Sequence, residues 1–224
     1  MLRKWEDLPK KMQTEAVRPY YEYLNKRRGS LFLKRTFDIV VSTVLLILIS
    51  PILLILAVMI ATDSKGGIFY RQERETQYGR VFRIFKFRTM VADADKIGTQ
   101  VTVQNDSRIT KIGEKLRKYR LDELPQLLNI LMGDMTLVGT RPESIHYVEH
   151  YTPEMYATLL LPAGVTSEAS ILYRDEAKLL RNVDKVYVEK ILPEKMKYNL
   201  EDIRRFSCVK EIGTIFRTVL AVVR

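Results

Sequence analysis

The chain has 224 residues, with 37 Lys and Arg against 27 Asp and Glu, which gives a formal net charge of +10. This length fits one domain of ordinary size plus a membrane segment, and the charge favours anionic partners such as phosphorylated small molecules, acidic lipid or nucleic acid. The only cysteine, Cys208, excludes a disulfide within the chain, which is typical of proteins in the reducing cytoplasm.

Residues 1–31 are predicted to form a basic N-terminal extension. Three tyrosines, Tyr20, Tyr21 and Tyr23, stand just before a Lys-Arg-Arg cluster at 26–28. Tyrosines beside arginines are typical of a segment that approaches the membrane interface. A partly ordered tail explains the same composition, so we assign this extension no function beyond contact with a membrane or a partner subunit.

The run 39–61 is the dominant feature of the sequence, because its 23 residues carry no charge. About 20 such residues are enough to cross a bilayer as a helix. Near the middle of the run, Pro51 lacks a backbone donor and kinks a helix, and the hydroxyl of Ser50 can bond a carbonyl that the kink frees. We therefore predict that the membrane helix breaks at Ser50 and Pro51.

Both flanks of this run are basic, with Lys34 and Arg35 before it and Lys65 and Arg71 after it. A spanning helix usually has its excess of Lys and Arg on the cytoplasmic side alone, so two basic flanks favour two cytoplasmic ends. We predict that residues 32–63 form a re-entrant helix hairpin that enters one leaflet and returns. An ordinary single-span anchor explains the run about as well.

A short β-hairpin is predicted after the membrane segment, from strand-like runs at 68–71 and 80–87 with a turn at 77–79. The second run ends at Lys86 and Arg88, which alternate with phenylalanine rings. These two cations are candidates for a phosphate-binding edge. A half-solvated strand with a charged edge is the simpler interpretation.

Two amphipathic helices are predicted in residues 64–224, which we assign to a domain on the cytoplasmic side. The run 108–119 has apolar residues at helical spacing and a basic opposite face, which is typical of a helix that lies in the membrane interface. The run 203–223 is a second amphipathic helix, either interfacial or packed on the domain. Between them, residues 143–200 look mainly helical, with predicted breaks at Pro153, at 162–164 and at Pro193.

Asp122 and Glu123 stand at the predicted start of a further helix. An apolar stripe of leucines places this helix from about Pro125 to Gly133, with a strand at 135–138 after it. The positive end of the helix dipole favours acidic residues at such a start. An N-terminal cap is therefore the simpler interpretation of the two carboxylates.

The same two carboxylates are also the strongest candidates for chemistry. Cations precede them directly in the sequence, and Lys86, Arg88 and Arg141 are candidates to join them in space. A carboxylate can attack phosphorus, and phosphoryl transfer needs cations and usually Mg²⁺, held by one or two carboxylates plus phosphate oxygens.

A competing motif is H-x-x-E-H at His146, Glu149 and His150, a zinc-hydrolase pattern with two histidine ligands and a glutamate base. These are the only two histidines in the chain, so a third ligand would have to be a carboxylate. A pattern of five residues is weakly specific, and nothing in its flanks indicates a catalytic zinc fold.

Five runs stand in order along the chain: FKFRTM at 85–90, NDSRIT at 105–110, LDELPQL at 121–127, GDM at 133–135 and VGTRP at 138–142. Together with the Ser50-Pro51 pair they resemble the bacterial sugar transferase family, the monotopic phosphoglycosyl transferases that start glycan assembly on a polyprenyl phosphate. The resemblance runs from about residue 32 to the C-terminus. It implies an α+β, mainly helical fold with a re-entrant membrane helix hairpin, interfacial amphipathic helices and a small catalytic domain with a short β-hairpin.

The resemblance implies a reaction in two steps. Asp122 attacks the β-phosphorus of a UDP-sugar, UMP leaves, and the phosphosugar stays on the carboxylate until a polyprenyl phosphate such as undecaprenyl phosphate takes it. Glu123 serves as general base for the lipid phosphate or helps to place Mg²⁺, which bridges Asp122 and the diphosphate. Arg88, Arg117 and Arg141 match cationic positions that the family places about the phosphates.

The resemblance also implies a place at the bacterial inner membrane, with the catalytic domain facing the cytoplasm, in the first membrane step of capsule, lipopolysaccharide or exopolysaccharide assembly. The implied partners are a UDP-sugar, a polyprenyl phosphate and the anionic leaflet, and a homo-oligomer is left open. Thr140 stands where the family usually has proline, and PAGVTS at 162–167 departs from its Pro-Gly-x-Thr-Gly pattern, so the identity of the sugar is not carried over. The alternative function is a single-span anchor with a basic docking module, and the apolar run disfavours nucleic-acid binding.

Overall fold

The computed structural model describes residues 2–92, 94, 106–173 and 183–223 of the chain, so Asn105 of the second quoted run lies outside the described residues. The described part is mainly helical with two two-stranded sheets, which confirms the predicted α+β class. In chain order the longer elements are α1 (Arg18–Asn25), α2 (Arg28–Asp63), β1 (Phe69–Thr76), β2 (Arg80–Phe87), α3 (Lys111–Lys118), α4 (Gln126–Met132), β3 (Met135–Val138), α5 (Ile145–Val148), β4 (Ala163–Thr166), α6 (Glu168–Leu172), α7 (Val183–Val186), α8 (Leu192–Arg204) and α9 (Cys208–Val223). Short 3-10 turns are η1 (Trp5–Asp7), η2 (Lys10–Met12), η3 (Gln77–Gly79), η5 (Leu121–Glu123) and η6 (Met155–Leu160), and a π-helical segment, η8, spans Tyr187–Ile191.

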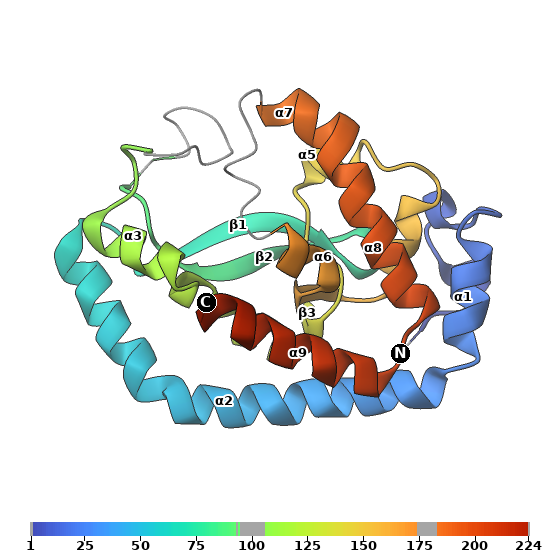
Figure 1. Ribbon diagram of the computed structural model, residues 1–224, viewed down its shortest axis with the longest axis horizontal. Helices are drawn as coiled ribbons and strands as arrows, with labels where there is room; N and C mark the ends of the chain where they lie inside the picture. Colours follow the sequence, from blue (N-terminus) through green and yellow to red (C-terminus); the bar gives the residue numbers. More distant parts are fainter. Residues whose placement is uncertain (1, 93, 95–105, 174–182, 224) are drawn as a thin grey trace.

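Helix α2 is one helix of 36 residues, and Figure 1 shows it bending along the edge of the molecule. Pro51 lies inside this helix, and the Ser50 hydroxyl donates to the carbonyl of Ile47 at 2.8 Å. Among the described residues, α2 is the one helix long and apolar enough to cross a membrane, and only 11% of its apolar 18-residue window is buried. The helix therefore continues through Ser50 and Pro51, so the predicted break is wrong. The re-entrant hairpin stays a prediction.

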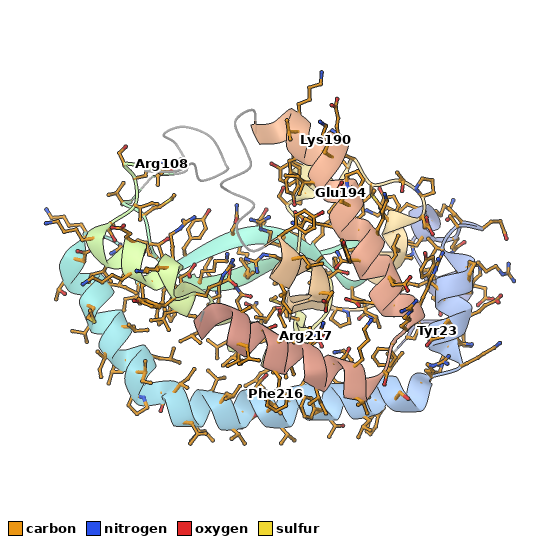
Figure 2. All side chains as sticks on the ribbon, viewed as in Figure 1. Tyr23, Arg108, Lys190, Glu194, Phe216 and Arg217 are labelled. Atoms are coloured by element: carbon orange, nitrogen blue, oxygen red, sulfur yellow. The ribbon has the colours of Figure 1, made fainter. Side chains whose placement is uncertain are left out.

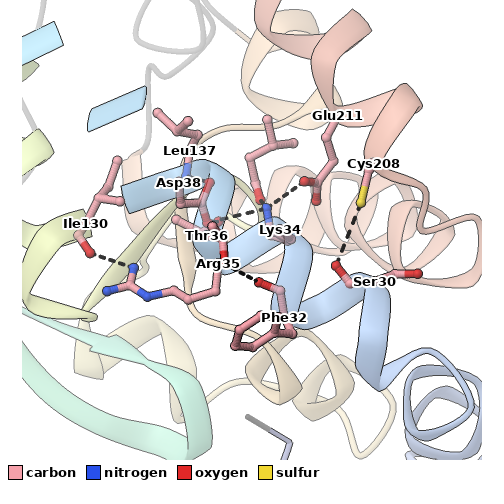
Figure 3. A network of polar contacts seen from close by, with 12 residues as sticks. Ser30, Phe32, Lys34, Arg35, Thr36, Asp38, Ile130, Leu137, Cys208 and Glu211 are labelled. Atoms are coloured by element: carbon pink, nitrogen blue, oxygen red, sulfur yellow. Dashed lines mark hydrogen bonds and ion pairs between the residues drawn. The ribbon is translucent and has the colours of Figure 1, made fainter. Parts of the chain in front are cut away.

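The N-terminal part of α2 is tied to the rest of the chain by buried polar side chains, which Figure 3 shows from close by. Lys34 Nζ donates to the carbonyl of Val138 at 2.9 Å and pairs with Glu211 of α9 at 2.7 Å. Asp38, also buried, accepts a hydrogen bond from the hydroxyl of Thr136 in β3. Because buried charges are costly without partners, these contacts fix α2 against β3 and α9.

The C-terminal part of α2 packs on the opposite end of the same domain. Leu56 and Ile60 are buried against Phe87 of β2 and Leu116 of α3. The carboxylate of Asp63 accepts a hydrogen bond of 3.2 Å from a backbone N–H in the first turn of α3. Both ends of the apolar helix are thus held by one body of protein. Many side chains of its middle are exposed, while Val41, Leu46 and Ile49 pack against the core beneath.

Strands β1 and β2 form the predicted antiparallel hairpin, with Phe69 opposite Phe87 and Thr76 opposite Arg80. The turn between them takes a left-handed backbone at Gly79, where φ is 72°. Strand β1 is longer than the predicted 68–71, because pairing with all of β2 extends it to Thr76. The hairpin buries one face against α4 through Phe82, Ile84, Leu127 and Ile130.

A second sheet, which we did not predict, pairs β3 in parallel with β4. The two strands approach so closely at one point that a Cβ atom on Gly164 would lie 2.2 Å from backbone atoms of Gly139. The run at 162–164, predicted as a helix break, therefore leads into a strand whose glycine is required by that approach.

The C-terminal part differs from the prediction at two places. Pro193 lies near the start of α8, which follows α7 and the π-helical segment η8 without a gap, so the predicted break does not interrupt the helical run. The helix predicted at 203–223 begins instead at Cys208, because α8 ends at Arg204. Exposed apolar residues line α9, namely Val209, Ile212, Phe216, Val219 and Leu220.

The N-terminal residues are an integral part of the core and not a loose tail. Met12, Val17 and Leu24 are fully buried, in one cluster with Leu160 of η6 and Leu192 of α8. Figure 2 shows the side chains of α1 and α8, with Tyr23 and Glu194 labelled on them.

Candidate active site

The two candidate carboxylates lie in η5, a single turn between α3 and α4. Arg120, directly before it, has φ 55° in the left-handed region, which costs a non-glycine residue about 1 kcal/mol or more. Helix α4 begins right after Pro125 and ends at Gly133, where φ is 85°. Asp122 and Glu123 therefore precede the helix as predicted, on a turn whose backbone is sharply bent.

Glu123 is clamped by two cations from distant segments. Lys86 Nζ contacts Oε1 of Glu123 at 3.3 Å, and Nη1 of Arg141 contacts Oε2 at 3.2 Å. The Nη2 atom of Arg141 also donates to Oε1, so the guanidinium grips both oxygens. Burial opposes ionisation of this carboxyl, but Arg141 and Lys86 together outweigh it and hold the pKa of Glu123 below its usual range. Glu123 is thus a fixed, ionised anchor.

Asp122 is adjacent to Glu123, but its carboxylate is not held by any cation among the described residues. Within the described part of the chain, its carboxylate makes no hydrogen bond and no ion pair. Burial, and then the negative charge of Glu123, raise the pKa of Asp122, while Lys86, Arg117 and Arg141 act against the rise. A weakly solvated carboxylate without partners is a better nucleophile than one held in an ion pair. When the surroundings raise the pKa of one carboxyl and lower that of its neighbour, the two groups typically have different catalytic roles.

Three of the four predicted phosphate-binding cations converge on this pair. Lys86 comes from the end of β2, Arg117 from the last turn of α3, and Arg141 from the segment after β3. Burial lowers the pKa of Lys86, and the charge of Glu123 opposes that shift. The three side chains surround Asp122 with positive charge from three separate elements.

Arg88 does not join this group. It is buried, and its Nη2 atom donates to the carbonyl of Ile60 at 3.2 Å and to that of Ser64 at 2.6 Å, at the C-terminal end of α2. Cations at this end of a helix satisfy carbonyls that have no helical partner. Its assignment to phosphate stays a prediction, and its contacts join the membrane helix to β2.

Arg74 is a cation near the site that the sequence analysis missed. It lies on β1, and its charge acts on both Lys86 and Arg141. The signal was present, because period-two alternation continued from Tyr70 through Arg74 would have placed it on the same face of the hairpin as Lys86. The predicted strand ended too early, at residue 71.

Asp122 is the carboxylate of the pair that is open to Mg²⁺, because Arg141 contacts both oxygens of Glu123. Magnesium commonly takes one or two carboxylates plus phosphate oxygens, and Asp122 offers oxygens that no described cation occupies. His146 and His150 are exposed, and Nδ1 of His150 lies 2.9 Å from the carbonyl of His146. Among the described residues, no group of three or more His, Cys, Asp or Glu is placed to hold a metal, so the zinc hypothesis has no support.

A profile of the bacterial sugar transferase family matches residues 29–224 of the chain. The UDP-glucose:undecaprenyl-phosphate glucose-1-phosphate transferase of Escherichia coli (strain K12) is 38% identical over 192 residues, which cover 84% of this chain and 39% of that protein. The UDP-N-acetylgalactosamine-undecaprenyl-phosphate N-acetylgalactosaminephosphotransferase of Aeromonas hydrophila is 33% identical over 192 residues, covering 84% of this chain and 43% of that protein. The exopolysaccharide production protein PSS of Rhizobium leguminosarum bv. phaseoli is 39% identical over 148 residues, or 63% of this chain and 74% of that protein. The chain therefore spans about two fifths of the length of the first two relatives.

Proposed function

The chain belongs to the bacterial sugar transferase family, and we propose on that premise that it transfers a sugar phosphate from a UDP-sugar to a polyprenyl phosphate. Relatives from two organisms are named for such transfers to undecaprenyl phosphate. The observation that carries the proposal is the contrast between the clamped Glu123 and the unpartnered Asp122. A docking module without catalysis has no need of an isolated carboxylate ringed by cations.

In the first step, an oxygen of Asp122 attacks the β-phosphorus of the UDP-sugar. The bond from that phosphorus to the bridging oxygen breaks, UMP leaves with the electron pair, and the sugar phosphate is esterified to Asp122. Lys86, Arg117 and Arg141 offset the negative charge that gathers on the phosphates. Asp122 and the donor diphosphate would together hold Mg²⁺, which supplies further positive charge to the leaving group.

In the second step, a phosphate oxygen of the polyprenyl phosphate attacks the phosphorus on Asp122. The bond from phosphorus to the carboxylate oxygen breaks, which restores Asp122 and releases a lipid-linked diphosphate sugar. The attacking phosphate is already an anion, and Glu123 with its lowered pKa is a poor proton acceptor. We therefore assign Glu123 to positioning Lys86 and Arg141, in place of the general-base role that the resemblance implied.

The membrane helix supports a site at the surface of one leaflet. Both ends of α2 contact the domain that holds Asp122, and a helix that crossed the bilayer straight would carry them to opposite faces. Apolar side chains of α9, such as Phe216 at 68% exposure, add a second surface for lipid. We place the protein on the cytoplasmic face of a bacterial inner membrane, where a soluble nucleotide sugar and a lipid phosphate meet.

The proposal is tested by weighing the intact protein after it meets donor without acceptor. With a panel of UDP-sugars, the wild type should gain the mass of a phosphorylated sugar and release one equivalent of UMP. The Asp122→Asn variant should gain nothing, whereas Glu73→Gln, an exposed carboxylate on the hairpin, should behave as the wild type. UMP release by Asp122→Asn at the wild-type rate would remove the nucleophile from the mechanism.

A further inference from the structure

The register of the hairpin places Arg74 toward the active site. In an antiparallel pair, residues directly opposite each other point to the same face of the sheet. Tyr70 is opposite Lys86 and Arg74 is opposite Phe82, and alternation puts Lys86 and Phe82 on one face of β2. Arg74 therefore shares the face that carries Lys86, the cation that contacts Glu123.

The charges around Arg74 are not balanced by the nearby carboxylates. Glu123 is already shared by Lys86 and Arg141. The hydrogen bond of the Arg74 guanidinium goes to a neutral amide, Oε1 of Gln72, at 2.6 Å. Lys86, Arg141 and Arg74 thus act on one another beside the clamped Glu123 and the unpaired Asp122. Burial lowers the pKa of Arg74, and Glu143 opposes that shift.

Glu143, the carboxylate whose charge acts most on Arg74, is hydrogen-bonded to other side chains. Glu143 is buried, and its Oε1 accepts from the hydroxyl of Tyr187 at 2.7 Å and from Nζ of Lys195 at 3.4 Å. Its negative charge offsets part of the charge of Arg74, yet among the described residues no ion pair joins the two side chains. The side of Arg74 that faces Lys86 and Arg141 is left with an excess of positive charge, which an anionic ligand would neutralise.

We propose that Arg74 binds the diphosphate of the nucleotide donor, as a cation of the site beside Lys86 and Arg141. On binding, the guanidinium exchanges the neutral amide of Gln72 for phosphate oxygens, which its planar fork contacts in pairs. Gln72 thus holds the side chain in reach while the site is empty of donor. This inference rests on the proposed function for the identity of the ligand.

The test compares two arginines of the same hairpin. Arg74→Gln removes the proposed contact, and Arg83→Gln is the matched control, since Arg83 lies on the other face, is 66% exposed and pairs with exposed Glu73. Binding of UDP and of inorganic pyrophosphate to the full chain in lipid nanodiscs is measured by calorimetry. Arg74→Gln should weaken both by about 10- to 100-fold, the usual effect of losing hydrogen bonds to a charged group. Arg83→Gln should leave both unchanged.

A charge-conserving variant separates binding from a merely structural effect. Arg74→Lys should recover part of the affinity for pyrophosphate, whereas a structural role would leave both Arg74 variants equally impaired or equally normal. Wild-type affinity in Arg74→Gln, or equal losses in Arg74→Gln and Arg74→Lys, would overturn the inference. Failure of the proposed function shows separately, as absence of UMP release by the wild type, and the pyrophosphate measurement still decides the role of Arg74.

Discussion

Arg141 and Glu123 form a two-pronged ion pair that joins the segment after β3 to the turn before α4. Nη1 of Arg141 contacts Oε2 of Glu123 at 3.2 Å, and its Nη2 contacts Oε1. Arg141 is also one of the cations whose charge acts on Asp122. The pair therefore fixes a cation near Asp122, and this cation comes from a segment outside both α3 and α4.

The first prediction concerns this fork. Arg141→Lys should lower kcat/KM for UMP release by about 10- to 100-fold, because a lysine ammonium cannot make two parallel contacts and charged hydrogen bonds contribute about 1.5–3 kcal/mol. The measurement is UMP release at several donor concentrations. Arg83→Lys, on the exposed face of the hairpin, is the control and should retain the wild-type value. A normal kcat/KM in Arg141→Lys would show that charge alone is enough at this position.

The second prediction concerns pH. Asp122 must be ionised to attack, and its raised pKa means that first-step activity falls, on acidification, at a higher pH than for an ordinary aspartate. Glu123, whose pKa is lowered, stays ionised through the same range. In Glu123→Gln the like charge beside Asp122 is gone, so the acid limb should move to lower pH. Single-turnover UMP release across pH measures it, and an unmoved or upward-shifted limb would contradict this electrostatic coupling.

The third prediction concerns the parallel strand pair. A Cβ atom on Gly164 would meet backbone atoms of Gly139 at 2.2 Å, so Gly164→Ala must push β3 and β4 apart. We expect a loss of about 2 kcal/mol or more, seen as a lower Tm in detergent. Gly213→Ala is the control, because nothing lies within 4 Å of its Cβ position on exposed α9, and alanine there should stabilise the helix by up to about 1 kcal/mol. Equal Tm values in the two variants would refute the close approach.

The fourth prediction concerns topology. In a Cys208→Ser background, single cysteines at Ser30→Cys and Lys65→Cys flank the apolar part of α2. Both should react with a membrane-impermeant maleimide only after spheroplasts are opened, since the same domain holds both ends of the helix. A cysteine at an exposed position of the domain, Glu73→Cys, gives the cytoplasmic reference. Labelling of one flank in sealed spheroplasts would establish a single-span anchor instead.

The sequence was most informative where periodicity is local. The stripes of α3 and α4, the alternation of β2 and the apolar run of α2 each follow from side chains a few residues apart. Strand β4 has four residues after a proline, and it exists only because β3 pairs with it. The N-terminal core likewise depends on distant partners, since Met12 and Val17 are buried by η6 and α8 and show no period of their own.

The candidate site was predictable in its chemistry and less so in its membership. The sequence predicts Asp122 and Glu123 as catalytic carboxylates and Lys86, Arg117 and Arg141 as phosphate-binding cations, and the fold brings these five residues together. Which arginine faces the site depends on the length of β1 and on the other acceptors near each guanidinium. Arg74 was missed because the predicted strand was too short. Arg88 is drawn away because it donates to the carbonyls of Ile60 and Ser64 at the end of α2.

In the proposed membrane placement, the attachment of α2 to the domain at both of its ends would set the height of Asp122 above the bilayer. Because Lys34 joins this helix to Glu211 of α9, and Leu56 and Ile60 dock its other end, the domain cannot tilt or lift without breaking buried contacts. Bilayer thickness and lipid packing then determine how closely an embedded phosphate approaches the carboxylate. If the proposed function holds, lipid composition would control turnover directly, through the distance between the lipid phosphate and Asp122, without any allosteric signal.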